Sequence, residues 1–167
     1  MASYGKIYEF VRDSQNGAEI IITISKKNYT GESMVRPLGR APLLKRENNG
    51  HIFGTSLEIY AECKVDGEFA QFYTSSADEF LVEVLKDQVR IWSGFISPEL
   101  YSEPDIAPPY DVQIIATDGL GELRNFGFIN DGDITISDHL SQLISHTGLS
   151  LETVMASDLR YYGGEVA

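Results

Sequence analysis

The residues most suggestive of chemistry form the turn Asp118-Gly-Leu-Gly121, which follows an apolar run. Glycines that follow a strand occur in phosphate-binding loops, where backbone N–H groups surround an anion. This turn has neither a GxGxxG nor a GK[ST] pattern, and no lysine follows it. The two glycines instead permit positive φ where a strand ends, and Asp118 can accept hydrogen bonds from N–H groups in the turn that it opens. We therefore interpret this turn as architecture.

The three histidines do not form a metal-binding pattern. His139 and His146 are seven residues apart in a predicted helix, which separates them by about 10 Å along the axis, too far to share one ion. His51 lies in an Asn-Asn-Gly-His turn. The stretch 130–133 (Asn-Asp-Gly-Asp) is like the start of a calcium loop, but no acidic ligand follows at the required spacing. We predict no metal site and no cofactor.

The candidate nucleophiles and carboxylate pairs do not indicate a catalytic site either. Cys63 lies beside Glu62 and Lys64; we place it on the polar side of its strand and interpret it as structural, because no histidine is near it in sequence. No GxSxG pattern occurs. Because the chain has 25 Asp and Glu residues, some carboxylate pairs will lie close by chance, so a glycosidase pair cannot be argued from their number. We predict no catalytic residue and no enzyme activity.

Length and composition suit one domain, spanning residues 1–167. No segment has the roughly 18–20 consecutive apolar residues of a membrane helix. The start, MASYGKIYEF, lacks the pattern of a signal peptide. A single cysteine excludes an internal disulfide, which fits a cytosolic origin.

The net charge of −12 is distributed unevenly along the chain. Residues 1–50 hold 8 Lys/Arg and 5 Asp/Glu, a sum of +3, whereas residues 51–167 hold 5 and 20, a sum of −15. Such an acidic surface repels nucleic acid, which needs cations to replace the counterions of its phosphates. The basic cluster Arg36, Arg40, Lys45 and Arg46 is interpreted as a solvated loop or a contact for an acidic neighbour.

Alternation of apolar and polar residues predicts a mainly β protein. Turn signals and prolines separate the predicted strands, and the segments 27–40 and 97–109 read as long loops. Such spacing is typical of an antiparallel β-sandwich or barrel. The predicted strands are 7–11, 19–26, 52–64, 69–75, 80–85, 89–94 and 110–118.

The end of the chain carries the pattern of one helix near residues 138–147. Ser137 is a suitable N-cap, Gly148 a suitable C-cap, and Leu140, Leu143 and Ile144 follow the helical period. Residues 149–154 alternate again, which would suit one more strand. We expect residues 150–167 to begin a following segment, so that the chain is the N-terminal part of a longer protein.

Several short stretches together resemble the phage tail hub proteins of Bacteroides phages and prophages. Their order along the chain carries the resemblance more than any one of them. The stretches are Tyr73-Thr-Ser, Glu79-Phe-Leu-Val-Glu-Val, Trp92-Ser-Gly-Phe-Ile, Tyr101-Ser-Glu-Pro, Ala107-Pro-Pro-Tyr110, Ala116-Thr-Asp-Gly-Leu-Gly-Glu-Leu123 and Thr147-Gly-Leu149.

The resemblance implies a baseplate hub component with a fold of the tail-tube type, that is, a β-sandwich or barrel with one packed helix. It implies a structural protein of the virion tail, synthesised in the bacterial cytoplasm, that forms a homo-oligomeric ring around the tail channel and contacts other tail or baseplate proteins. Sequence-specific nucleic-acid binding and membrane binding are not expected. On this interpretation Pro108-Pro109 restricts the backbone where a strand begins, because proline fixes φ and cannot pair there, and residues 118–121 turn the chain out of the sheet.

A second hypothesis is a β-sandwich module that binds carbohydrate or protein through the loops 27–40 and 97–109. Tyr29, Trp92 and Tyr101 would then stack on sugar rings. A hydrolase, as a third class, has no nucleophile or metal motif to support it.

Overall fold

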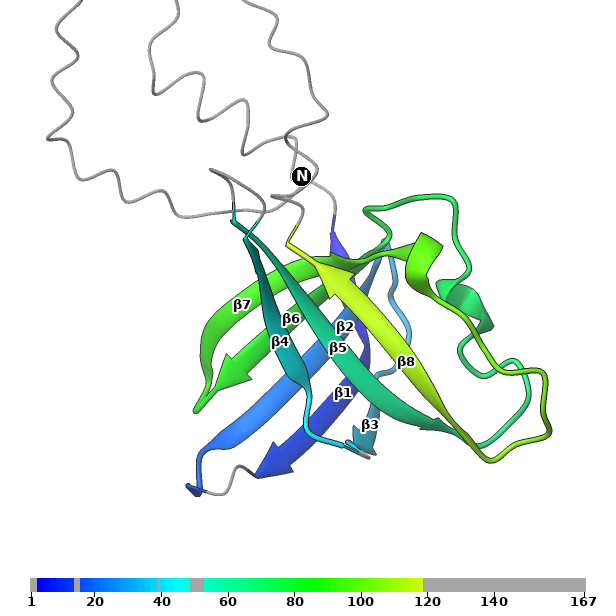
Figure 1. Cartoon of the computed structure of the whole chain (residues 1–167), viewed down its shortest axis with the longest axis horizontal. Coiled ribbons are helices and arrows are strands. Elements are labelled where there is room, and N and C mark those ends of the chain that lie inside the picture. Colours follow the sequence, from blue (N-terminus) through cyan, green and yellow to red (C-terminus); the bar gives the residue numbers. More distant parts are fainter. Residues whose placement is uncertain (1–2, 14–15, 39, 49–52, 119–167) are drawn as a thin grey trace, which may run out of the picture.

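The computed structural model describes residues 3–13, 16–38, 40–48 and 53–118, and this part of the chain is mainly β (Figure 1). Two short 3-10 helices, η1 (Ala70–Phe72) and η2 (Pro98–Leu100), lie in the connections. The strands are β1 (Tyr4–Asp13), β2 (Glu19–Lys27), β3 (Met34–Pro37), β4 (Leu43–Asn48), β5 (Phe53–Cys63), β6 (Phe80–Lys86), β7 (Val89–Ile96) and β8 (Tyr110–Thr117).

All eight strands belong to one sheet, in the order β3-β1-β2-β6-β7-β8-β5-β4. Neighbouring strands are antiparallel except β1 and β3, which run parallel. The expectation of an antiparallel sheet is therefore wrong for this pair, because the chain leaves β2 and returns on the far side of β1. The two outer strands, β3 and β4, are consecutive in sequence and are joined by residues 38–42.

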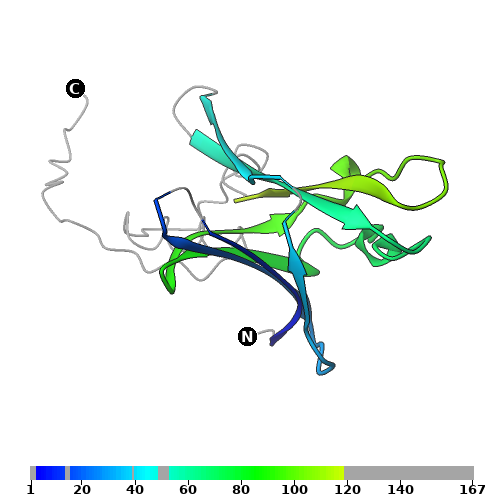
Figure 2. The same ribbon diagram turned by 90° about the horizontal axis from the view of Figure 1, so that it is seen from below.

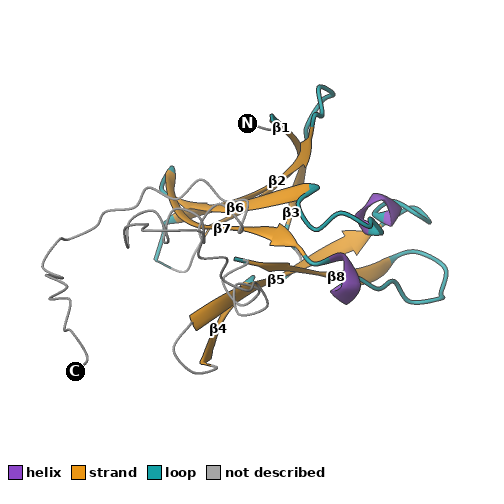
Figure 3. Cartoon of the chain, turned by 90° about the horizontal axis from the view of Figure 1, so that it is seen from above, coloured by secondary structure: helices purple, strands orange, loops and turns teal. Residues whose placement is uncertain are grey.

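The sheet curls until its two halves face each other, as Figures 2 and 3 show. The strands β3, β1, β2, β6 and β7 form one layer, and β8, β5 and β4 form the other. In the described residues, β7 and β8 connect the two halves through two residue pairs, Phe95 with Thr117 and Ile96 with Ala116. This confirms the mainly β, sandwich-like prediction.

The core lies between the layers and is rich in aromatic rings. Phe72 packs edge-on against Phe80, with ring centroids 5.0 Å apart, and stacks at 5.8 Å on Phe69. Every second residue of β6 and β8 is buried, as their alternation predicted. The largest fully buried side chains are Phe10, Phe69, Phe72, Phe80, Ile22, Ile24, Ile59, Ile96, Ile114, Val82, Val112 and Cys63.

The predicted strand 69–75 is wrong, because this segment contains η1 instead. Phe69 and Phe72 are both fully buried. In a strand, residues three apart point to opposite faces, whereas a 3-10 turn places them on the same side. The need to bury both rings therefore overrides the β propensity of this segment.

Two edge strands were also missed. β3 lies inside the predicted loop 27–40, and it is short and ends at Pro37, which suits only a sheet edge. β4 has no alternation to detect, because the four side chains from Leu43 to Arg46 are all exposed. Cys63 is fully buried and shares a face with Ile59 and Ala61, so its placement on the polar side was wrong.

The strand after Pro108-Pro109 begins at Tyr110 as predicted, and this Pro-Pro peptide bond is cis. The predicted helix 138–147, the strand 149–154, the segment 150–167 and all three histidines lie outside the described residues. Among the residues that are described, no helix is long and apolar enough to cross a membrane.

Candidate protein–protein interface

Strand β4 presents an exposed edge of the sheet. Within the described ranges β4 pairs only with β5. Leu44 is paired with the core residue Leu57 and points to the same face, yet it is 47% exposed, and so is Leu43 on the opposite face. At this end the two layers diverge, so the other layer does not cover β4 closely (Figure 2). An edge strand with exposed apolar side chains is a ready surface for a further chain.

The side chains around β4 bring three cations to this end of the molecule. Lys45 forms an ion pair with Glu58, and Arg46 follows it on the exposed strand. Arg40, in the link before β4, forms an ion pair with Asp111 at 3.2 Å and lies over the ring of Tyr60 at 5.3 Å. Lys45 and Arg40 are thus paired with carboxylates, and Arg46 is the further cation that lies beside the two leucines.

Glu58 holds the outer face of the β4–β5 pair together. Its carboxylate accepts hydrogen bonds from Lys45 and from the Tyr60 hydroxyl, the latter at 3.0 Å, and that hydroxyl accepts one from Gln113 at 3.4 Å. The hydrogen bond from Lys45 lowers the pKa of Glu58 below its ordinary value of 4.5, against the opposing effect of desolvation. The pair therefore favours the ionised carboxylate.

We expect the free energy of unfolding of the variant Glu58→Gln to depend less on pH, in the acid range, than that of the parent protein. A carboxyl group whose pKa is lower in the folded state stabilises the fold above its unfolded pKa, and this stability is lost as pH falls through the folded pKa. The variant should therefore be less stable than the parent protein at neutral pH, and the difference should shrink as pH falls below about 4.5. Urea unfolding at a series of pH values measures it, and a pH-independent difference would contradict it.

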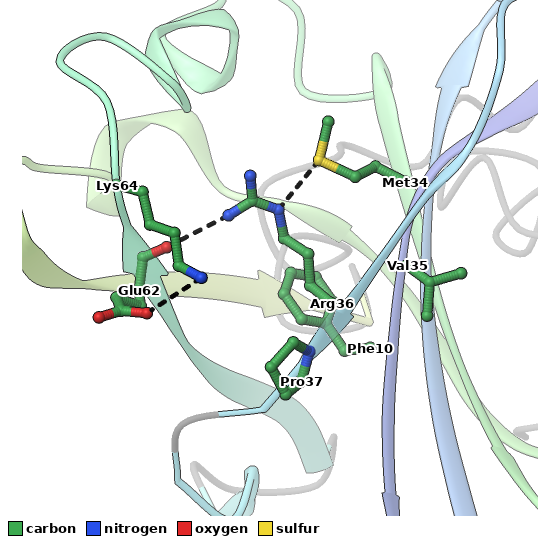
Figure 4. Close-up of a pocket in the computed structure, with 7 residues that line it drawn as sticks. All are labelled: Phe10, Met34, Val35, Arg36, Pro37, Glu62 and Lys64. Carbon is green, nitrogen blue, oxygen red and sulfur yellow. Dashed lines mark hydrogen bonds and ion pairs between the residues drawn. The ribbon is translucent and has the colours of Figure 1, made fainter.

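A cavity of about 210 Å³ lies in the seam between β3 and the end of β5 (Figure 4). It is lined by Phe10, Met34, Val35, Arg36, Pro37, Glu62 and Lys64. Its guanidinium group is already engaged: Arg36 forms an ion pair with Glu68, donates to the Glu62 carbonyl oxygen at 3.3 Å and lies over the Phe69 ring at 5.5 Å. Arg36 therefore connects β3 to the end of β5. The cavity lies between these two strands, and the charged group that lines it is already paired within the protein.

The loop 97–109 is fixed to the sheet through Glu103. The carboxylate of Glu103 accepts hydrogen bonds from the hydroxyls of Tyr101 at 2.5 Å and Tyr110 at 2.8 Å, and its backbone N–H donates to the Tyr73 hydroxyl at 3.1 Å. Burial, with the bond to Glu103, raises the pKa of Tyr101. Hydrogen bonding to Cys63 and to Glu103 raises the pKa of Tyr110. Both phenols therefore remain neutral donors that hold the loop in place.

Asp118 connects the end of β8 to β5. Its carboxylate accepts from the backbone N–H of Thr55 at 2.8 Å and from the Thr55 hydroxyl at 2.5 Å, across to β5. The Thr55 hydroxyl in turn accepts from the indole N–H of Trp92 at 2.7 Å. The predicted partners in the following turn lie outside the described residues, which end at Asp118.

Of the three aromatic residues expected to stack on sugars, two are buried and one is half-buried. Trp92 is 9% exposed and Tyr101 is 4% exposed. Tyr29 is half-buried, packs against the core, and its hydroxyl donates to the Glu32 carbonyl at 2.9 Å. The carbohydrate hypothesis therefore loses Trp92 and Tyr101 as stacking side chains, whereas Tyr29 stays partly exposed.

The free thiol of Cys63 is buried and donates to the Val65 carbonyl at 3.1 Å. Across residues 3–118, with the gaps given above, no group of three or more His, Cys, Asp or Glu side chains could hold a metal ion.

Comparison of the chain with protein-family models, with curated proteins and with solved structures found no match.

Proposed function

We propose that this chain is a structural component of a phage or prophage tail, a hub-type subunit that assembles into a ring around the tail channel. The exposed edge of β4 is the observation that supports it most directly. Within the part of the chain that the structure describes, β4 is open on one edge and exposed on both faces, which suits a subunit that is completed by its neighbours.

The charge distribution supports the same proposal. The basic residues gather in the first 50 residues and the acidic ones in the rest. Opposite charge on different parts of one molecule favours contact between unlike surfaces of two copies, and such heterologous contacts close into rings when the rotation allows. An acidic surface facing a channel would also keep DNA from binding as it passes.

Electron microscopy of phage particles from a producing strain tests the proposal. We expect an epitope-tagged chain to copurify with intact particles and gold-labelled antibody to mark the tail. An unrelated cytoplasmic protein with the same tag is the control, and it should be absent from the particles. A chain that stays in the soluble fraction and never enters the tail would contradict the proposal, however β-rich its fold.

A further inference from the structure

We propose that the β4 edge of one copy binds the loop 97–109 of a neighbouring copy. The β4 edge is defined here as Leu43–Arg46, and its complement is the exposed loop residues Glu99, Leu100, Asp105 and Ile106. This inference rests on the proposed function only in placing copies side by side, and it names the two surfaces through which they meet.

The β4 edge offers two leucines and two cations in one short strand. Leu43 and Leu44 are each 47% exposed and point to opposite faces. The neighbouring positions Lys45 and Arg46 are also exposed. A complementary partner must therefore bring apolar side chains together with carboxylates.

The loop 97–109 has that composition. Leu100 is 54% exposed and Ile106 is 61% exposed. Glu99 and Asp105 are exposed beside them. Because Lys45 is already paired with Glu58, these carboxylates pair with Arg46 while the apolar side chains cover the leucines, which matches opposite charge and apolar area on the two sides.

The loop is also held ready for binding. Glu103 fixes it through the hydroxyls of Tyr101 and Tyr110, and Tyr101 packs against Tyr73 with ring centroids 4.8 Å apart. These contacts face inward and leave Glu99, Leu100 and Ile106 outward. A loop that is already ordered loses less conformational entropy when a partner binds.

The two surfaces lie toward opposite ends of the molecule. In the views of Figures 1 and 2, β4 lies on one side of the curled sheet and the loop before β8 extends from the other. The same copy cannot bring them together, so a second copy must supply the partner surface. The contact then joins unlike surfaces and can propagate from copy to copy.

Disulfide trapping of the full chain tests the contact. One variant carries Arg46→Cys and a differently tagged variant carries Glu99→Cys, and the two are mixed and oxidised. Because the native Cys63 is buried, it contributes little background. We expect the mixed pair to cross-link at least several-fold more than either variant alone, and a chain carrying both substitutions to give a ladder of higher oligomers.

A matched control replaces the first variant by Arg12→Cys, which removes an exposed cation at the end of β1. This variant should not cross-link to Glu99→Cys above background. Circular dichroism of every variant checks that the fold is retained. Absence of the mixed cross-link, or an equally efficient cross-link between two Arg46→Cys copies, would overturn the proposed contact.

A charge swap gives a second readout. With Leu43→Cys and Ile106→Cys as the reporting pair, Arg46→Glu should lower the cross-linking yield, and Glu99→Lys on the other copy should restore it. Lack of rescue would overturn the assignment of these two residues. If the chain is found in tail particles but the cross-link never forms, the contact is wrong and the tail function stands; if the cross-link forms but particles lack the chain, the function is wrong.

Discussion

Replacing Gly94 by alanine is expected to destabilise the protein by about 3 kcal/mol or more, the upper range for overpacking a close-packed site. Gly94 lies in β7 just before the two residue pairs that join it to β8. A Cβ atom here would meet the backbone carbonyl of Thr117 more closely than real Cβ atoms approach, and it would lie 2.5 Å from the Trp92 ring. Because the obstacle is backbone, only a shift of β7 away from β8 can relieve it.

Urea unfolding, followed by the fluorescence of Trp92, measures this loss directly, since the chain has a single tryptophan and its side chain is buried. The neighbouring variant Ser93→Ala is the matched control, because Ser93 is half-buried on the same strand. It should change stability by no more than about 0.5 kcal/mol, as expected of a substitution that creates no cavity or clash. Equal midpoints for Gly94→Ala and the parent protein would show that β7 and β8 are not held this closely.

Truncating Phe72 is expected to cost about 3–5 kcal/mol, the usual range for Phe→Ala in a core. Phe72 is fully buried, and its ring contacts those of Phe80 at 5.0 Å, Tyr101 at 5.6 Å and Phe69 at 5.8 Å. The variant Phe72→Ala therefore leaves a cavity at the point where η1, β6 and the loop 97–109 meet. Since small domains are stable by about 5–15 kcal/mol, this one change removes a large share of the total.

The variant Val65→Ala serves as the control for Phe72→Ala. Val65 lies in the same connection between β5 and β6 but is 66% exposed. Its truncation should shift the midpoint of thermal or urea unfolding only slightly. If both variants lose the same stability, Phe72 is not part of the core and the placement of η1 is wrong.

The elements that the sequence predicts well are those with one face in the core. In β6 and β8 every second residue is buried, so the alternation of Phe80, Val82 and Val84 against Leu81 and Glu83 reports the structure directly. Local pattern fails where burial depends on distant residues. Phe69 and Phe72 lie on a 3-10 turn because both rings pack into the same part of the core, and only the folded structure shows which residues surround them.

The sequence marked Lys45 and Arg46 as a solvated loop or a contact for an acidic neighbour, but the strand that carries them escaped prediction for the opposite reason. β4 has all four side chains from Leu43 to Arg46 exposed, so no burial pattern marks it as a strand. It is a strand because it pairs with β5, whose residues come later in the chain. The one sign of an interface in the sequence was the leucine pair followed by two cations, because apolar residues next to charged ones suit a contact surface. The hydrogen bonds between Asp118 and Thr55, 63 positions apart, have no signature in sequence.

The link between the two outer strands fixes the overall shape of the sheet. β3 ends at Pro37 and β4 begins at Leu43, although they lie at opposite edges of an eight-stranded sheet. Fully extended, these six steps of chain span roughly 20 Å, at about 3.3–3.6 Å per residue. In a flat sheet the seven spacings between the edges would total about 34 Å, at about 4.8 Å each. The tether is too short for that, so unrolling the sheet requires a pairing to break first: the covalent order of the strands excludes a flat ribbon with all pairings intact.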